Sequence, residues 1–166
     1  MKTIVNKTKP FNTKKSVQRA SQKELLRREW MIESEGKQYI WTSKMERVAI
    51  IREGIPYSSL EIISKKLNRP IKTVLSLVGM PQTTYNKKKN EKSLLDRRDS
   101  ELVLLIIELV DFGLEVFNLE EDKFQRWLKK PNLSLGGNTP ESMLDTLTGI
   151  NEVKFALNRL EYGNLA

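Results

Sequence analysis

Apolar residues recur with helical spacing along most of the chain after residue 43. Leu60, Ile63 and Leu67 stand at positions i, i+3 and i+7, which is one face of a helix. The next segment repeats this spacing through Ile71, Val74, Leu75 and Val78. The segment Asn68-Arg69-Pro70 separates the two because proline cannot continue a helix. The pattern therefore predicts two short consecutive helices.

The same pattern predicts further elements on both sides of this pair. We expect helices over 21–34, with Ser21 as the cap, and over 43–52, with Gly54 at the end. The second should turn Met45, Val48, Ala49 and Ile50 inward. Residues 37–42 contain Tyr39, Ile40 and Trp41 and favour a short extended piece. Helices are also predicted over 82–89, anchored by Tyr85, and over 120–130. The fold class is therefore expected to be all-α.

Residues 100–118 predict one long helix that is almost entirely apolar. Its acidic residues form a single narrow stripe, made of Glu101, Glu108, Asp111 and Glu115. A helix of this kind must bury most of its circumference. We expect it to be the central core helix and also to contribute a dimer interface. The charges inside the apolar run argue against a membrane span, because each is costly at membrane depth.

Composition excludes several kinds of chemistry. The 166 residues contain no Cys and no His, so zinc sites with these ligands, a catalytic triad and a Cys–His pair are ruled out. The acidic run Glu120-Glu121-Asp122 makes a poor acid–base pair, since sequence neighbours on a helix point in different directions. We therefore expect no enzyme, no cofactor and no bound metal. The N-terminus lacks the apolar segment of a signal peptide, which favours a cytoplasmic protein.

The net charge of +8 is distributed unevenly. Residues 1–30 carry a net +7 and residues 61–100 a net +6, whereas residues 101–166 carry a net −5. A basic front attracts phosphate and an acidic end repels it, so the pattern suggests two different partners. Residues 1–20 have few large apolar groups and are expected to form a flexible basic arm.

The turn Gly79-Met80-Pro81 between two short helices favours a helix-turn-helix. The helix after the turn would read bases with Gln and Asn and contact phosphates with Lys. The alternative is a helical hairpin in an all-α domain whose lysines are simply solvated. The candidate DNA-binding residues are Gln82, Thr83, Thr84, Asn86, Lys87, Lys88, Lys89 and Lys92.

Turn-forming residues are dense near the C-terminus. Pro131 should end one helix, and Gly136-Gly137 permits backbone angles that other residues resist. Thr139-Pro140 should begin a short helix, with a hydroxyl cap followed by proline at the first helical position. Gly149 is predicted to end this helix, and Asn151 to cap the last one. The last helix is expected to bury Val153, Ala156, Leu157 and Leu160.

Five motifs in this region resemble the C-terminal toxin-binding domain of the Xre/MbcA/ParS antitoxins. They are Trp127-Leu128, Pro131-Asn132, Leu135-Gly136-Gly137, Thr139-Pro140 and Tyr162-Gly163, in the family's order.

Residues 54–117 resemble the Xre-like helix-turn-helix domain that precedes this domain in the family. The matching pieces are Gly54-Ile55-Pro56, Val78-Gly79-Met80 and the helix from Gln82 to Lys89. Pro81 replaces a small hydroxylated residue of the family and removes a side-chain cap. Lys87 and Lys88 replace arginines, which keeps the charge and loses the bidentate fork.

The resemblance implies the antitoxin of a bacterial type II toxin–antitoxin pair. Such antitoxins dock on a RES-type toxin that consumes nicotinamide adenine dinucleotide, and the chain end after Arg159 would enter the toxin's cleft. The implied partners are this toxin and operator DNA, bound by a homodimer within a larger toxin–antitoxin complex. The implied toxin-binding residues are Trp127, Pro131, Asn132, Leu135, Gly136, Gly137, Thr139, Pro140, Arg159, Glu161, Tyr162, Gly163 and Asn164.

The expected domain order is a basic arm (1–20), a helical extension (21–53), a helix-turn-helix domain (54–119) and a toxin-binding domain (120–166). The acidic C-terminal region would complement a basic toxin cleft, so reversing Glu152 and Glu161 to Lys should weaken binding. The alternative function is a plain helix-turn-helix repressor whose C-terminal half only dimerises. Such a repressor has no need of the five C-terminal motifs.

Overall fold

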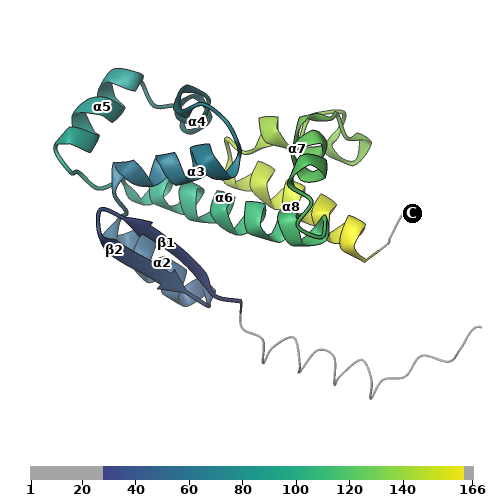
Figure 1. The fold of residues 1–166 in the computed structure, drawn as a ribbon, viewed down its shortest axis with the longest axis horizontal. Coiled ribbons are helices and arrows are strands. Elements are labelled where there is room, and N and C mark those ends of the chain that lie inside the picture. Colours follow the sequence, from purple (N-terminus) through teal and green to yellow (C-terminus); the bar gives the residue numbers. More distant parts are fainter. Residues whose placement is uncertain (1–27, 163–166) are drawn as a thin grey trace, which may run out of the picture.

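The computed structural model describes residues 28–162, which form a helical protein with one two-stranded sheet (Figure 1). The elements are β1 (Trp30–Ser34), β2 (Lys37–Trp41), α2 (Lys44–Glu53), η1 (Tyr57–Ser59), α3 (Leu60–Lys66), α4 (Ile71–Val78), α5 (Gln82–Asn90), α6 (Arg97–Val116), α7 (Glu121–Lys129), η2 (Leu133–Leu135), η3 (Glu141–Met143) and α8 (Leu147–Glu161). The all-α prediction is confirmed in its main part, and the small sheet is an addition to it.

Helix α6 lies at the centre of the fold, as predicted. It packs against α2 and α3, which come from the N-terminal half of the chain, and runs beside α8, which comes from the C-terminal half (Figure 1). Asp96 caps its N-terminus by accepting a hydrogen bond from the Asp99 amide at 2.8 Å. The apolar side chains of α6 from Leu102 to Val110 are nearly all buried. The two halves of the chain therefore share one core along this helix.

Three of the four residues in the acidic stripe of α6 form ion pairs with other parts of the chain. Glu108 is 5% exposed and accepts hydrogen bonds from Trp41 Nε1 at 2.7 Å and from Arg47 Nη1 at 2.5 Å. Two further ion pairs join Asp111 to Lys66 and Glu115 to Arg28. Within residues 28–162, no large apolar side chain of α6 is exposed. The helix thus offers no free apolar face for a dimer, and the homodimer stays a prediction that would use another surface.

The helix predicted over 21–34 is wrong for residues 30–34, which form β1. Residues 21–27 lie outside the described part. Strand β1 pairs antiparallel with β2, and Ile32 lies opposite Tyr39. Glu35 and Gly36 both have positive φ, 53° and 75°, and form the tight turn between the strands. The extended piece predicted over 37–42 is confirmed, and Trp41 on it is fully buried.

Helix α2 begins and ends where the sequence predicts. Ser43 accepts a hydrogen bond from the Glu46 amide at 3.2 Å, and Gly54 ends the helix with φ of 88°. The predicted inward face is confirmed for Ile50 and wrong for Met45, which is 75% exposed, and for Ala49, which is also exposed; Ile51 is buried instead. The true core face of this short helix lies near its C-terminus, where it meets α6.

Gly149 does not end a helix, which corrects the prediction for the C-terminal region. Helix α8 begins at Leu147, and Thr146 is its cap, accepting from the Gly149 amide at 3.0 Å. Asn151 therefore lies inside α8. A Cβ atom at residue 149 would lie 2.0 Å from the carbonyl oxygen of Met143, so only glycine permits this approach of η3 to α8. Pro140 starts only the single 3-10 turn η3.

Candidate DNA-binding and toxin-binding surfaces

Helices α4 and α5 form the predicted helix-turn-helix. Gly79 ends α4 in the left-handed conformation, with φ of 70°, and the Met80 amide donates to the Leu75 carbonyl at 2.8 Å. Pro81 stands at the start of α5 and provides no side-chain cap. Tyr85 is 3% exposed, so it is the buried anchor of α5 that the sequence predicts.

A carboxylate of α3 fixes the orientation of α5. The Tyr85 hydroxyl donates to Glu61 Oε1 at 3.0 Å, and Lys89 forms an ion pair with the same oxygen. The hydrogen bond from Lys89 lowers the pKa of Glu61, and the bond from Tyr85 acts in the same direction. Burial and this neighbouring carboxylate raise the pKa of Tyr85. Lys89 is thus turned toward α3, unlike the other lysines of α5.

The remaining candidate DNA-binding residues are exposed or half-buried, and all but Lys92 belong to α5. Gln82 Nε2 donates to Asn86 Oδ1 at 3.1 Å, so these two amides form one adjacent pair on the surface. The Lys87 side chain is 74% exposed, and both Lys87 and Lys88 lie near Glu91. Thr83, Thr84 and Lys92 are also exposed.

The loop that carries the toxin-binding motifs is closed by its own hydrogen bonds. Asn132 Oδ1 accepts from both the amide and the hydroxyl of Ser134, each at 2.9 Å. The Asn132 amide donates to the Asn138 carbonyl at 3.0 Å. Gly136 and Gly137 have φ values of 64° and 81°, and these left-handed conformations reverse the chain direction after η2. The loop therefore has a defined shape that a partner can recognise.

Burial divides the predicted toxin-binding residues within the described part into three groups. Leu135 and Pro140 are buried, and Trp127 is partly buried in a stack with Phe124, with ring centroids 6.2 Å apart. These residues pack in the core beneath the exposed loop 131–139. Asn132 and Thr139 are partly exposed. The exposed group consists of Pro131, Gly136, Gly137, Arg159, Glu161 and Tyr162. Gly163 and Asn164 lie outside the described residues.

Two apolar residues on this surface were missed by sequence reasoning. Leu133, between Asn132 and Ser134, is 96% exposed, and Phe155 on α8 is 59% exposed. Leu160, which we expected in the core, is 41% exposed. Phe155 lies outside the apolar repeat of Val153, Ala156 and Leu157, which was the signal that could have revealed it.

The outer side of α8 is hollowed beside Phe155. The hollow has a volume of about 380 Å³ and is lined by Glu152, Phe155, Asn158, Arg159 and Tyr162. The turn η2, which carries Leu133, packs against α8, the helix that carries the hollow. An exposed aromatic side chain with an arginine beside it is typical of a protein-binding surface.

The described residues show neither a metal-binding cluster nor a membrane-spanning helix. Residues 28–162 contain no cluster of three or more acidic side chains that could hold a metal ion. None of the helices in this range is long and apolar enough to cross a membrane.

Comparison with known proteins identifies the domains that carry these two surfaces. The family described as the antitoxin Xre-like helix-turn-helix domain matches residues 46–108, and the family described as the antitoxin Xre/MbcA/ParS C-terminal toxin-binding domain matches residues 113–163. An Antitoxin Xre of Photorhabdus laumondii is 30% identical over 115 residues, covering 69% of this chain and 78% of that protein. This chain belongs to the Xre family of antitoxins.

Other relatives of this Xre antitoxin are similar over most of their length. An Antitoxin Xre of Yersinia enterocolitica is 25% identical over 113 residues, covering 68% of this chain and 76% of that protein. A protein of a Sphingobium species named Prs ADP-ribosylating antitoxin is 30% identical over 132 residues, covering 75% and 83%. The motifs noted in the sequence thus belong to an antitoxin of a toxin–antitoxin system that carries a helix-turn-helix.

Proposed function

We propose that this Xre antitoxin neutralises its toxin by covering the toxin's active site, without catalysing a reaction. The observation that carries the proposal is the pair of exposed apolar side chains, Leu133 and Phe155, within the toxin-binding domain. Large apolar groups held in water on a rigid frame are typical anchors of a protein interface. Arg159 and Tyr162 line the same hollow and add polar contacts.

The toxin is proposed to be a RES-type protein that consumes nicotinamide adenine dinucleotide. The similarity to a protein named Prs ADP-ribosylating antitoxin supports a toxin that uses this dinucleotide. Nicotinamide adenine dinucleotide is the usual donor of ADP-ribose. The chain end after Arg159 is proposed to reach into the cleft that holds the dinucleotide. Glu152 and Glu161, both exposed, would face basic groups of that cleft.

The second proposed activity is repression of the chain's own operon in the cytoplasm. Gln82 and Asn86 stand where the reading helix would meet base edges, and Lys87 and Lys88 stand nearer its end, where phosphates would lie. Two copies bound to a palindromic operator would place two such helices in successive major grooves. The basic arm would add affinity that does not depend on sequence.

The alternative is a repressor whose C-terminal half only dimerises. The same exposed surface of Leu133 and Phe155 would then bind a second copy of the chain. The toxin-binding reading is favoured because the match to the toxin-binding domain covers the whole of this surface up to residue 163.

A titration against the toxin tests the proposal. The full chain is titrated into the purified product of the toxin gene beside its own gene. Leu133→Ser and Phe155→Ser should each weaken binding at least about tenfold, as loss of an apolar anchor does. Met45→Ser is the matched control, since Met45 is 75% exposed on α2, outside the toxin-binding domain. Equal affinity of all four chains would contradict the proposal.

A further inference from the structure

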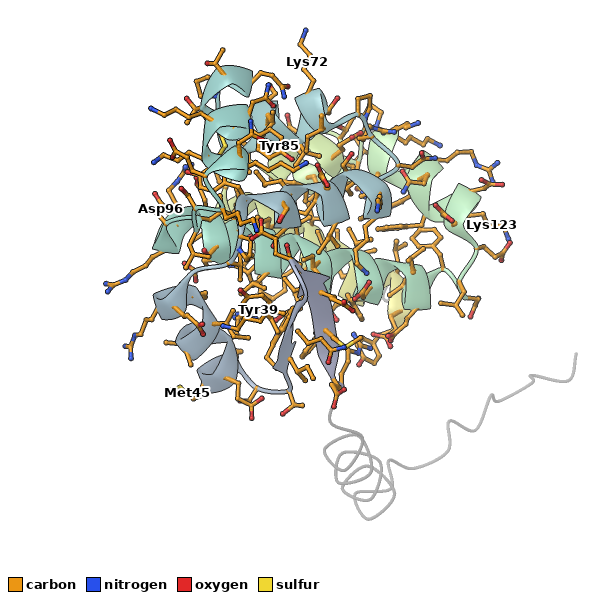
Figure 2. All side chains as sticks on the ribbon, turned by 60° about the vertical axis from the view of Figure 1, so that its left-hand side comes forward. Tyr39, Met45, Lys72, Tyr85, Asp96 and Lys123 are labelled. Carbon is orange, nitrogen blue, oxygen red and sulfur yellow. The ribbon has the colours of Figure 1, made fainter. Side chains whose placement is uncertain are left out.

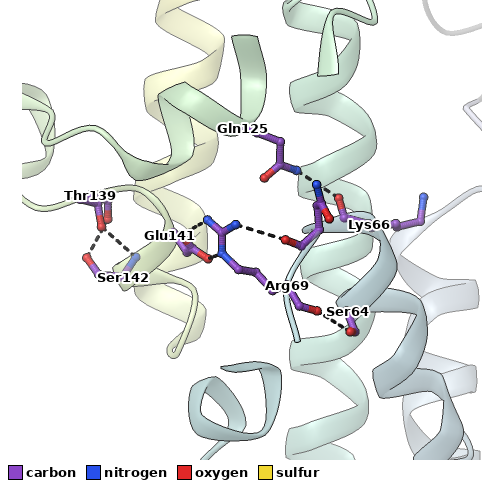
Figure 3. Close-up of polar contacts among 8 residues, drawn as sticks. Ser64, Lys66, Arg69, Gln125, Thr139, Glu141 and Ser142 are labelled. Atoms are coloured by element: carbon purple, nitrogen blue, oxygen red, sulfur yellow. Dashed lines mark hydrogen bonds and ion pairs between the residues drawn. The ribbon is translucent and has the colours of Figure 1, made fainter. Parts of the chain in front are cut away.

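The helix-turn-helix unit and the toxin-binding unit are joined by an ion pair in addition to the shared helix α6 (Figure 3). Arg69 donates from Nε to Glu141 Oε1 at 2.5 Å and from Nη2 to Glu141 Oε2 at 2.7 Å. The two side chains are only 15% and 18% exposed. A bidentate pair of this kind fixes the angle between its partners as well as their distance.

Arg69 projects from a rigid part of the helix-turn-helix unit. Its amide donates to the Ser64 carbonyl at 2.9 Å, and the Ser64 hydroxyl donates to the Arg69 carbonyl at 2.5 Å. Asn68 before it has φ of 51°, and Pro70 after it begins α4. The backbone of Arg69 is therefore fixed between the end of α3 and the start of α4.

Glu141 is fixed just as firmly to the loop of the toxin-binding motifs. It lies in η3, directly after Thr139-Pro140. The Ser142 amide donates to Thr139 Oγ1 at 3.3 Å, and the Ser142 hydroxyl donates to the Thr139 carbonyl at 2.7 Å. The preceding residue, Asn138, closes the loop through its bond to the Asn132 amide, beside the exposed Leu133. A shift of Glu141 would therefore move the whole loop.

The remaining contacts between α3 and the toxin-binding unit are weaker. Gln125 Nε2 donates to the Lys66 carbonyl at 3.3 Å (Figure 3). Gln125 Oε1 is buried and has no hydrogen-bond partner among the described residues. An interface of few polar contacts opens more easily than an apolar core. The bidentate pair is thus the strongest of the polar contacts that hold the loop from this side.

We propose that Arg69 is a positioning residue for toxin binding: through Glu141 it holds the 132–140 loop in the shape that meets the toxin. The role rests on the proposed function, and it assigns to the helix-turn-helix unit a part in binding the toxin.

Hydrogen exchange in the full chain tests the positioning step without any toxin. Arg69→Gln and Glu141→Gln should each speed exchange of the amides of residues 132–144 about tenfold, while the melting temperature stays within a few degrees. Lys123→Gln is the matched control, because Lys123 and Glu120 form an exposed ion pair, 54% and 49% exposed, in the same unit. Unchanged exchange in both variants would overturn the proposal.

Toxin binding tests the consequence. The two single variants should each weaken binding of the toxin encoded beside this gene by about tenfold, and the double variant by no more than either, because they break one interaction. The exchanged pair Arg69→Glu/Glu141→Arg should recover part of the loss and serves if a single variant fails to fold. Unchanged affinity in the single variants would overturn the positioning role. If the wild-type chain does not bind the toxin, the proposed function fails, and the role of Arg69 in toxin binding fails with it. The exchange experiment contains no toxin, so it tests only whether the ion pair holds the loop.

Discussion

Arg47 and Glu108 form a largely buried ion pair that fastens α2 to the middle of α6. The distance between Nη1 and Oε1 is 2.5 Å, and the two side chains are 14% and 5% exposed. The same carboxylate oxygen accepts from Trp41 Nε1 at 2.7 Å, so one acidic residue holds both the sheet and α2. The N-terminal extension is thus part of the fold, with Tyr39 of its sheet close to α2 (Figure 2).

Replacing Glu108 with Gln should lower the free energy of unfolding by about 3 kcal/mol, because it leaves the charge of Arg47 buried without its partner. Urea unfolding of the two chains measures the difference. Glu101→Gln, on the same helix and in no ion pair among the described residues, should change stability much less. Equal losses in the two variants would show that the pair does not hold α2 to α6.

Gly149→Ala should destabilise the chain by about 1–3 kcal/mol, because its Cβ would lie 2.0 Å from the Met143 carbonyl oxygen and η3 would have to move. Thermal unfolding measures this effect, with Thr148→Ala as the control on the exposed side of α8. Since η3 carries Glu141, toxin affinity should fall as well. A melting temperature equal to that of the wild type would contradict the close approach.

Glu61→Gln should remove a contribution to stability that depends on pH. The bond from Lys89 lowers the pKa of Glu61 below its usual value of 4.5, so the folded state binds a proton here less readily than the unfolded state. The stabilising effect is therefore complete at neutral pH and is lost as the pH falls below about 4.5 through the folded pKa. Urea unfolding should separate wild type and variant at pH 7 and bring them closer together as the pH is lowered below 4.5. A constant difference would contradict the role of this carboxylate.

Lys87→Ala and Lys88→Ala should each reduce the slope of log affinity for operator DNA against log salt by about 0.9, if each lysine contacts one phosphate. Lys89→Ala should reduce it less, because Lys89 is engaged by Glu61. Lys129→Ala is the control. Lys129 is exposed on α7, outside the helix-turn-helix, so its loss should leave the slope unchanged. Slopes that do not respond to Lys87 or Lys88 would place the phosphates elsewhere.

The sequence predicted most of the helical order because apolar periodicity marks buried faces directly. The pairs α3–α4 and α4–α5, the long helix α6 and the anchor Tyr85 all followed from it. The β1–β2 hairpin was not predicted, because residues 21–34 were expected to be one helix and only residues 37–42 an extended piece. The turn between the strands consists of just two residues, Glu35 and Gly36. The role of Gly149 was misjudged because glycine serves both as a helix end and as a site of close approach, and only tertiary packing distinguishes them.

The candidate surfaces were predicted in outline from motifs, and burial then changed their composition. Leu135 and Pro140 belong to the motifs but are buried, whereas Leu133 and Phe155 are exposed and lie outside any motif element. The bridge between Arg69 and Glu141 joins residues 72 positions apart, and no local pattern indicates it.

The most direct test of the central claim measures nicotinamide adenine dinucleotide in cells that express the toxin gene beside this one. The toxin is expressed alone, with the full chain, and with a chain that lacks residues 160–166. We expect the dinucleotide to fall with the toxin alone, to stay at its normal level with the full chain, and to fall again with the truncated chain. A dinucleotide level that does not change in any of the three would contradict the account and favour the plain repressor.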